Sequence, residues 1–126
     1  MKLISILIAL VLAPYSYSNE KASFPSTLLG KWAPEIKYCA GDFNNYEGEY
    51  TGKWNVVITE HTIELVESSG RLISIIKSGS NYVVNLEMSG EGETWNENQA
   101  FILSSDGNKL SRTSRNYEFN YHRCEK

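Results

Sequence analysis

Two histidines, His61 and His122, are the residues of this chain best suited to acid–base or metal chemistry. His61 follows Glu60 in a short polar connection, and His122 alternates with aromatic residues near the end of the chain. Zinc sites usually gather about three or four histidine, cysteine or carboxylate ligands, and the spacing of these histidines supplies no such group. No nucleophile-elbow motif is present for a serine that a histidine and a carboxylate would activate. The sequence therefore predicts neither a metal site nor a catalytic triad.

Two close pairs of glutamates, Glu47/Glu49 and Glu91/Glu93, are the remaining candidates for general acid–base chemistry. An apolar pocket is needed to raise the pKa of a glutamate into the range of an acid catalyst. Both pairs lie in glycine-rich segments that are typical of solvated turns. We therefore expect a protein that is not an enzyme and that has no cofactor.

The only two cysteines, Cys39 and Cys124, both follow the amino-terminal apolar run. In an oxidising compartment, two cysteines with a single possible pairing most simply form one disulfide. Such a bond would close most of the chain into one covalent loop and would stabilise it strongly. A pair of reactive thiols or metal ligands is the alternative, and the wide separation of the two cysteines in the sequence does not favour it.

Residues 1–18 have the layout of a secretory signal peptide. Lys2 gives a positive start, and the apolar run 3–13 is short for a membrane span. Ser16 and Ser18 stand at the −3 and −1 positions of a cleavage site before Asn19. No cysteine follows the run directly, so a lipid anchor is not expected. The sequence thus predicts export to the periplasm or the extracellular space, with no membrane span left after cleavage.

The charge of the chain limits the partners it can bind. The formal net charge is −3, and it becomes −4 when Lys2 leaves with the signal peptide. A mildly acidic surface without a basic stripe excludes nucleic acid and anionic lipid as expected partners. A small apolar ligand or an exported protein partner remains, and the oligomeric state stays open.

Short alternating runs separated by turn residues predict strands rather than helices. Tyr82, Val84, Leu86 and Met88 form one face of a half-buried strand, and the Ser-Asp-Gly-Asn run at 105–108 is a hairpin signal. The polar segment 93–98 is left unassigned. This pattern predicts an all-β fold, a single and mostly up-and-down antiparallel β-barrel of about eight short strands, with a two-sheet sandwich as the alternative. The expected strands cover 30–33, 54–59, 62–67, 71–77, 82–89, 100–103, 109–113 and 117–124.

Two segments outside these strands are expected to be irregular. Residues 19–29 are expected to be a flexible arm ahead of the barrel domain, which covers 30–126. The segment 38–52 is rich in glycine, asparagine and aromatic residues. It is expected to be a loop, either a binding lid over a barrel mouth or a surface loop pinned by its aromatic side chains.

The expected first strand begins with Gly30-Lys31-Trp32, and Arg123 lies near the end of the last. A Gly-x-Trp followed by such an arginine resembles the lipocalin and wider calycin pattern, and the chain is similar in size to small secreted bacterial lipocalin-like proteins. The resemblance implies a barrel closed at its base by Trp32, with the guanidinium of Arg123 stacked on the indole. Arg115 is the alternative stacking residue.

The leading functional hypothesis is a non-catalytic binding protein that holds a small apolar or amphipathic ligand inside this barrel. For each of the expected contact residues, packing in a filled core is the alternative interpretation. These expected ligand-binding residues are Tyr82, Val84, Leu86, Phe101, Tyr117 and Phe119.

The run Ser78-Gly79-Ser80-Asn81-Tyr82 carries a second, weaker resemblance, to periplasmic inhibitors of C-type lysozyme. That resemblance implies an inhibitor or immunity factor against a cell-wall hydrolase, with Ser80 and Tyr82 inserted toward the catalytic carboxylates of the enzyme. An ordinary turn is the alternative. Trp54 and Trp95 suit either a pocket mouth or a protein contact. The partner-binding residues in this hypothesis are Ser78, Ser80, Tyr82 and Trp95.

Overall fold

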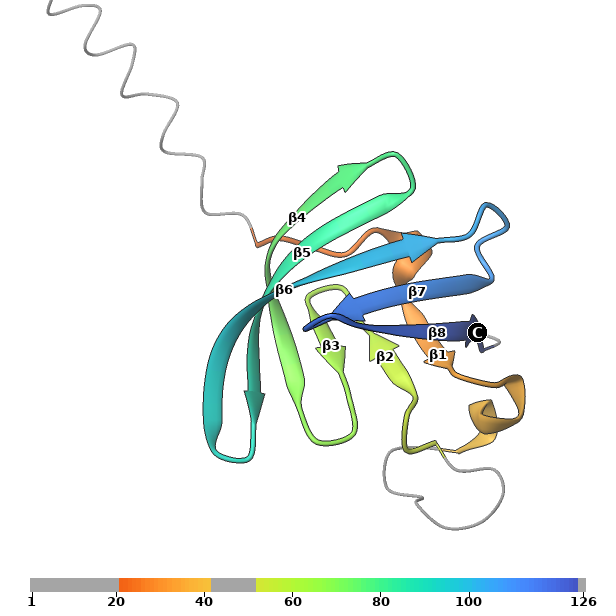
Figure 1. Cartoon of the computed structure of the whole chain (residues 1–126), viewed down its shortest axis with the longest axis horizontal. Coiled ribbons are helices and arrows are strands. Elements are labelled where there is room, and N and C mark those ends of the chain that lie inside the picture. The colour runs from red at the N-terminus through yellow and green to blue at the C-terminus, as the bar shows by residue number, and fades with distance from the viewer. Residues whose placement is uncertain (1–20, 42–51, 125–126) are drawn as a thin grey trace, which may run out of the picture.

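The computed structural model of the chain describes residues 21–41 and 52–124. Within these residues, eight strands form one closed antiparallel barrel, in which consecutive strands pair and β8 pairs with β1 (Figure 1). The predicted all-β, up-and-down barrel is confirmed, and the sandwich alternative is wrong. The predicted signal peptide and the central part of the predicted loop, 42–51, lie outside the described residues. The elements are η2 (Ser26–Leu28), β1 (Gly30–Ala33), η3 (Ile36–Ala40), β2 (Val56–Ile58), β3 (Thr62–Glu64), β4 (Ser69–Ser78), β5 (Asn81–Gly90), β6 (Glu93–Leu103), β7 (Lys109–Ser114) and β8 (Tyr117–Arg123).

The main difference from the predicted strands concerns β6, which begins at Glu93. It includes the polar segment 93–98, to which the sequence pattern assigns no strand. This segment pairs with β5 in continuous register from Gly90–Glu93 to Asn81–Ile102. Its polar residues alternate between solvent and a hydrogen-bonded cluster, so a strand forms there without an apolar face. The turn before β4 also lies earlier than predicted, because the Leu65 amide donates to the Ser68 carbonyl.

Of the expected flexible arm 19–29, the structure describes residues 21–29, and these pack instead against the barrel. Phe24 and Leu28 belong to the buried core, and the Phe24 ring stacks on Phe101 with 6.1 Å between centroids. The Phe24 amide donates to the Glu60 carbonyl, and His61 Nδ1 lies 2.9 Å from the Ala22 carbonyl oxygen. The amino-terminal segment therefore fills one end of the barrel, which we call the closed end.

Arg123 and Trp32 complete this closed end. The guanidinium lies 4.2 Å from the centroid of the Trp32 ring, and the two residues are paired across β1 and β8. Arg123 also donates to the carbonyls of Thr27, Leu29 and Gly107. The stacking implied by the lipocalin resemblance is thus present, and Arg115 lies elsewhere, over Trp95.

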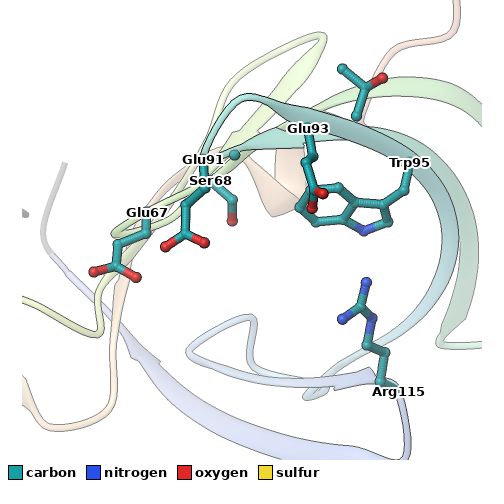
Figure 2. Close-up of a pocket in the computed structure, with 8 residues that line it drawn as sticks. Glu67, Ser68, Glu91, Glu93, Trp95 and Arg115 are labelled. Atoms are coloured by element: carbon teal, nitrogen blue, oxygen red, sulfur yellow. The ribbon is translucent and has the colours of Figure 1, made fainter.

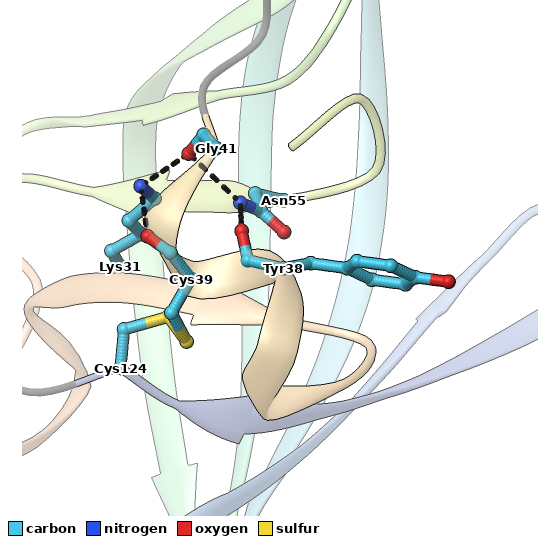
Figure 3. The surroundings of a disulfide bond; sticks show 6 residues. All are labelled: Lys31, Tyr38, Cys39, Gly41, Asn55 and Cys124. Carbon is cyan, nitrogen blue, oxygen red and sulfur yellow. Dashed lines mark hydrogen bonds between the residues drawn. A yellow bond between two sulfur atoms is a disulfide. The ribbon is translucent and has the colours of Figure 1, made fainter. Parts of the chain in front are cut away.

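The disulfide predicted from the cysteine count joins Cys39 in η3 to Cys124 after β8 (Figure 3). The two residues are separated by 85 positions. Further contacts hold η3 in place: Lys31 Nζ donates to the Cys39 carbonyl at 2.7 Å, and Asn55 Nδ2 donates to the Tyr38 carbonyl at 2.8 Å.

Candidate functional site

The six residues predicted to hold a ligand do not gather around one cavity. Val84, Leu86 and Phe101 are fully buried in the core cluster, and Tyr82 is 7% exposed within it. Tyr117 was expected to face the interior and is instead 70% exposed. Phe24, Leu28 and Trp32 fill the closed half of the barrel against these residues. The predicted position of the ligand deep in the barrel is therefore corrected, and Phe119 alone among the six borders the pocket described next.

A pocket of about 670 Å³ lies at the end of the barrel opposite Trp32 and Arg123. We call it the open-end pocket. Its position follows from the sheet, because β1 pairs with β8 only at Trp32–Arg123 and Ala33–His122. The first half of β8 therefore has a strand partner only on its β7 side, and the pocket lies along this edge. It is lined by Pro34, Tyr38, Lys53, Trp54, Asn55, Leu65, Val66, Glu67, Ser68, Arg112, Glu118, Phe119, Asn120 and Tyr121.

Large aromatic side chains dominate the walls of the open-end pocket. Trp54 is 59% exposed and Phe119 is 40% exposed, although both are large apolar residues. The Tyr38 and Tyr121 rings contribute further lining, and Leu65 adds an aliphatic wall from the β3–β4 turn. Concave apolar surface with a few fixed polar groups is typical of small-molecule sites, which measure roughly 300–1,000 Å³.

Lys53, Glu67 and Glu118 line this pocket as more exposed charged residues, and Arg112 is its buried charge. It lies on β7 with only 6% of its surface exposed. Its Nε and Nη2 donate to the Tyr121 hydroxyl at 3.1 and 2.9 Å, and its Nη1 donates to Gln99 Oε1 at 3.2 Å. The Phe119 ring covers the guanidinium, with its centroid 4.6 Å from Cζ. Within residues 21–41 and 52–124, no carboxylate forms an ion pair with Arg112.

Glu97 is the carboxylate connected to Arg112, and the connection is indirect. Gln99 Nε2 donates to Glu97 Oε2 at 3.0 Å, and the Ser114 hydroxyl donates to the same oxygen. Burial alone would raise the pKa of Glu97. These two hydrogen bonds, a third from the Trp95 indole and the positive charge of Arg115 instead hold the pKa below its ordinary value. Glu97 is therefore ionised at neutral pH, and it pairs directly with Arg115 rather than with Arg112.

A second pocket, which we call the acidic pocket, borders this cluster on the β5–β6 side (Figure 2). Its volume is also about 670 Å³. Figure 2 shows Arg115 pointing toward Trp95 across the pocket, and the guanidinium lies 5.4 Å from the indole centroid. Trp95, in the segment 93–98 to which the sequence pattern assigns no strand, is a strand residue whose Nε1 donates to Glu97 at 2.7 Å. The acidic pocket is lined by Glu67, Ser68, Gly90, Glu91, Glu93, Thr94, Trp95 and Arg115.

The loop singled out by the lysozyme-inhibitor resemblance is a tight β4–β5 turn. Ser78 and Asn81 pair at the ends of the two strands, and Gly79 and Ser80 form the exposed connection. Gly79 has φ of 63°, a conformation that glycine adopts easily. Tyr82 does not project from this turn, because its ring is packed in the core. The structure therefore matches the ordinary-turn alternative, and Tyr82 is not available to enter a partner's active site.

The structure places the two histidines in separate parts of the barrel. His61 contacts Glu60 and the Ala22 carbonyl in the β2–β3 turn, and His122 is paired between Lys109 and Ala33 in the sheet. In the described part of the chain, no three histidine, cysteine or carboxylate residues are grouped to hold a metal ion. The same residues contain no helix that is both long enough and apolar enough to cross a bilayer.

Sequence reasoning missed Arg112, Tyr121 and Asn55 as pocket residues. A signal for Arg112 was present, because Leu110 and Arg112 share one face of the predicted strand and the structure buries both. Asn55 is buried beside Trp54, and its Oδ1 accepts no hydrogen bond from the described residues. Its neighbours in sequence gave no indication of this burial, which depends on η3 folding back over β2.

No protein-family model, curated protein or solved structure matches this chain. The eight-stranded antiparallel barrel is compatible with a lipocalin-like fold.

Proposed function

We propose that this chain is an exported, non-catalytic binding protein that takes a small apolar or amphipathic molecule in the open-end pocket. The signal-peptide layout of residues 1–18 and the disulfide support export. The observation that carries the binding function is the exposure of Trp54 and Phe119 around a pocket whose floor holds Arg112. Side chains of this size are normally buried against other residues, and a bound apolar molecule would cover them.

The test uses the mature, oxidised chain and the neutral fluorescent probe N-phenyl-1-naphthylamine. We expect saturable binding, and we expect Trp54→Ala to weaken it by about threefold to tenfold through loss of apolar contact. Trp95→Ala is the matched control, because Trp95 lines the acidic pocket instead. Absence of saturable binding would rule out the function. Equal weakening by both variants would place the ligand elsewhere.

A second candidate function is binding of a cationic exported protein such as a cell-wall hydrolase. The acidic pocket favours it, because Glu67, Glu91 and Glu93 surround Trp95 there. Inhibition of a C-type lysozyme by the chain, reduced by Glu93→Gln and unaffected by Trp54→Ala, would support this function in place of the first.

A further inference from the structure

Arg112 stands out because a nearly buried cation lacks an ionic partner. Burial of a charge is costly unless the charge is paired, so buried arginines usually contact a carboxylate. In the described residues, Arg112 contacts only neutral acceptors, the Tyr121 hydroxyl and the Gln99 side-chain carbonyl. A guanidinium has more N–H donors than these three hydrogen bonds use.

The surrounding charges leave the cluster positive. Glu97 is its carboxylate, and Arg115 already pairs with Glu97 at 3.7 Å. Two guanidiniums, those of Arg112 and Arg115, therefore share one carboxylate among the residues that the structure describes. The buried charge of Arg112 borders the open-end pocket, whose other charged lining residues, Lys53, Glu67 and Glu118, are more exposed and better screened by water.

Tyr121 adds a second donor beside Arg112. Its hydroxyl oxygen accepts two hydrogen bonds from Arg112, so its own hydrogen is left to donate. None of the hydrogen bonds in the described part of the chain uses that hydrogen. Burial raises the pKa of Tyr121, which keeps the hydroxyl protonated and able to donate. Arg112 and Tyr121 both line the open-end pocket, so their free donors border the same space.

We propose that the ligand of the open-end pocket carries an anionic head group of the carboxylate, sulfonate or phosphate type, bound by Arg112 and Tyr121. The apolar body of this amphiphile lies against Phe119 and Trp54. This inference rests on the proposed function, because it assigns the chemistry of the same ligand. We expect positively charged amphiphiles to bind more weakly beside the buried charge of Arg112, and neutral ones leave its remaining donors unpaired.

The test compares two probes that share one apolar body. 8-Anilinonaphthalene-1-sulfonate is N-phenyl-1-naphthylamine with a sulfonate added. We expect the mature chain to bind the sulfonate about tenfold to a hundredfold more tightly, as charge-assisted hydrogen bonds would provide. Arg112→Met should remove this preference, so that the variant binds the sulfonate and the neutral probe with affinities within about twofold of each other. Arg71→Met is the matched control, because Arg71 is an exposed arginine on β4 that pairs with Glu87.

Tyr121→Phe keeps the aromatic ring and removes only the hydroxyl, so it tests the site if Arg112→Met fails to fold. It should weaken binding of the sulfonate about threefold to tenfold. Displacement of the sulfonate by dodecanoate and by dodecyl phosphate separates a carboxylate head from a phosphate head, and dodecanol is the neutral control.

The outcomes separate the two proposals. If the neutral probe binds and the sulfonate is not preferred, the anion site is wrong and the binding function stands. The anion site is also wrong if Arg71→Met lowers the preference as much as Arg112→Met. If neither probe binds, both proposals fail.

Discussion

Removing the disulfide by the double change Cys39→Ala/Cys124→Ala should cost the fold several kcal/mol, mainly through the unfolded chain. For a cross-link between positions 85 residues apart, the chain-entropy relation gives about 4.6 kcal/mol at 25 °C. The native contacts of η3 do not require the sulfur bond, because Lys31 and Asn55 still donate to its carbonyls. We therefore expect the variant to keep the barrel and to lose a large share of a stability that is about 5–15 kcal/mol in typical domains.

Guanidinium denaturation, followed by tryptophan fluorescence and far-ultraviolet circular dichroism, measures this loss. The slope of unfolding free energy against denaturant should rise, because an unfolded chain without the cross-link exposes more surface. Lys31→Met is the control, since it removes native contacts of η3 and keeps the disulfide; its expected loss is on the order of 1–2 kcal/mol. A loss below about 1 kcal/mol in the double variant, with an unchanged slope, would refute the chain-entropy reasoning.

Two further changes test the two ends of the barrel. Arg123→Met should lower the unfolding free energy by about 2–4 kcal/mol, because it loses several hydrogen bonds and the contact with Trp32. Arg115→Met should lower it by less than about 1 kcal/mol. Thermal melts measure both losses, and equal losses would contradict the assignment of Arg123 as the closing arginine. Because the folded-state pKa of Glu97 is lowered, its ionisation stabilises the fold above the ordinary pKa of glutamate, and this contribution is lost as the pH falls through the lower folded value. Melts of Glu97→Gln should accordingly depend less on pH in the acidic range than those of the unchanged chain, and parallel curves would show that Glu97 is not involved.

The barrel and its closed end were predictable because their signals are local or nearly so. Alternation of apolar and polar residues marks β5, and the Ser-Asp-Gly-Asn run marks the β6–β7 turn. Gly30 has φ of 121°, which explains why glycine precedes Lys31 and Trp32. With one pair of cysteines, the disulfide had a single possible connectivity.

The segment that the sequence predicts wrongly and the one that it leaves unassigned both depend on contacts that are distant in sequence. Phe24 and Leu28 are separated by polar and proline residues, and only the hollow end of a barrel gives them a place to pack. The first half of β6 is polar because Glu97 and Gln99 face a hydrogen-bonded cluster rather than an apolar core. A hydrophobic pattern carries no information about such a cluster, since its stability comes from pairing of polar groups.

The interior of the barrel changes in character along its length, and this change places the site. Near Trp32 the interior is filled by apolar side chains, which stabilises the fold and leaves little room for a ligand. Arg112 and Gln99 begin a polar layer one step further along β6 and β7. Burial of a guanidinium is costly unless the charge is paired, and Arg112 has only neutral acceptors among the described residues. The proposed anion site would give this buried cation the ionic partner that it lacks among the described residues.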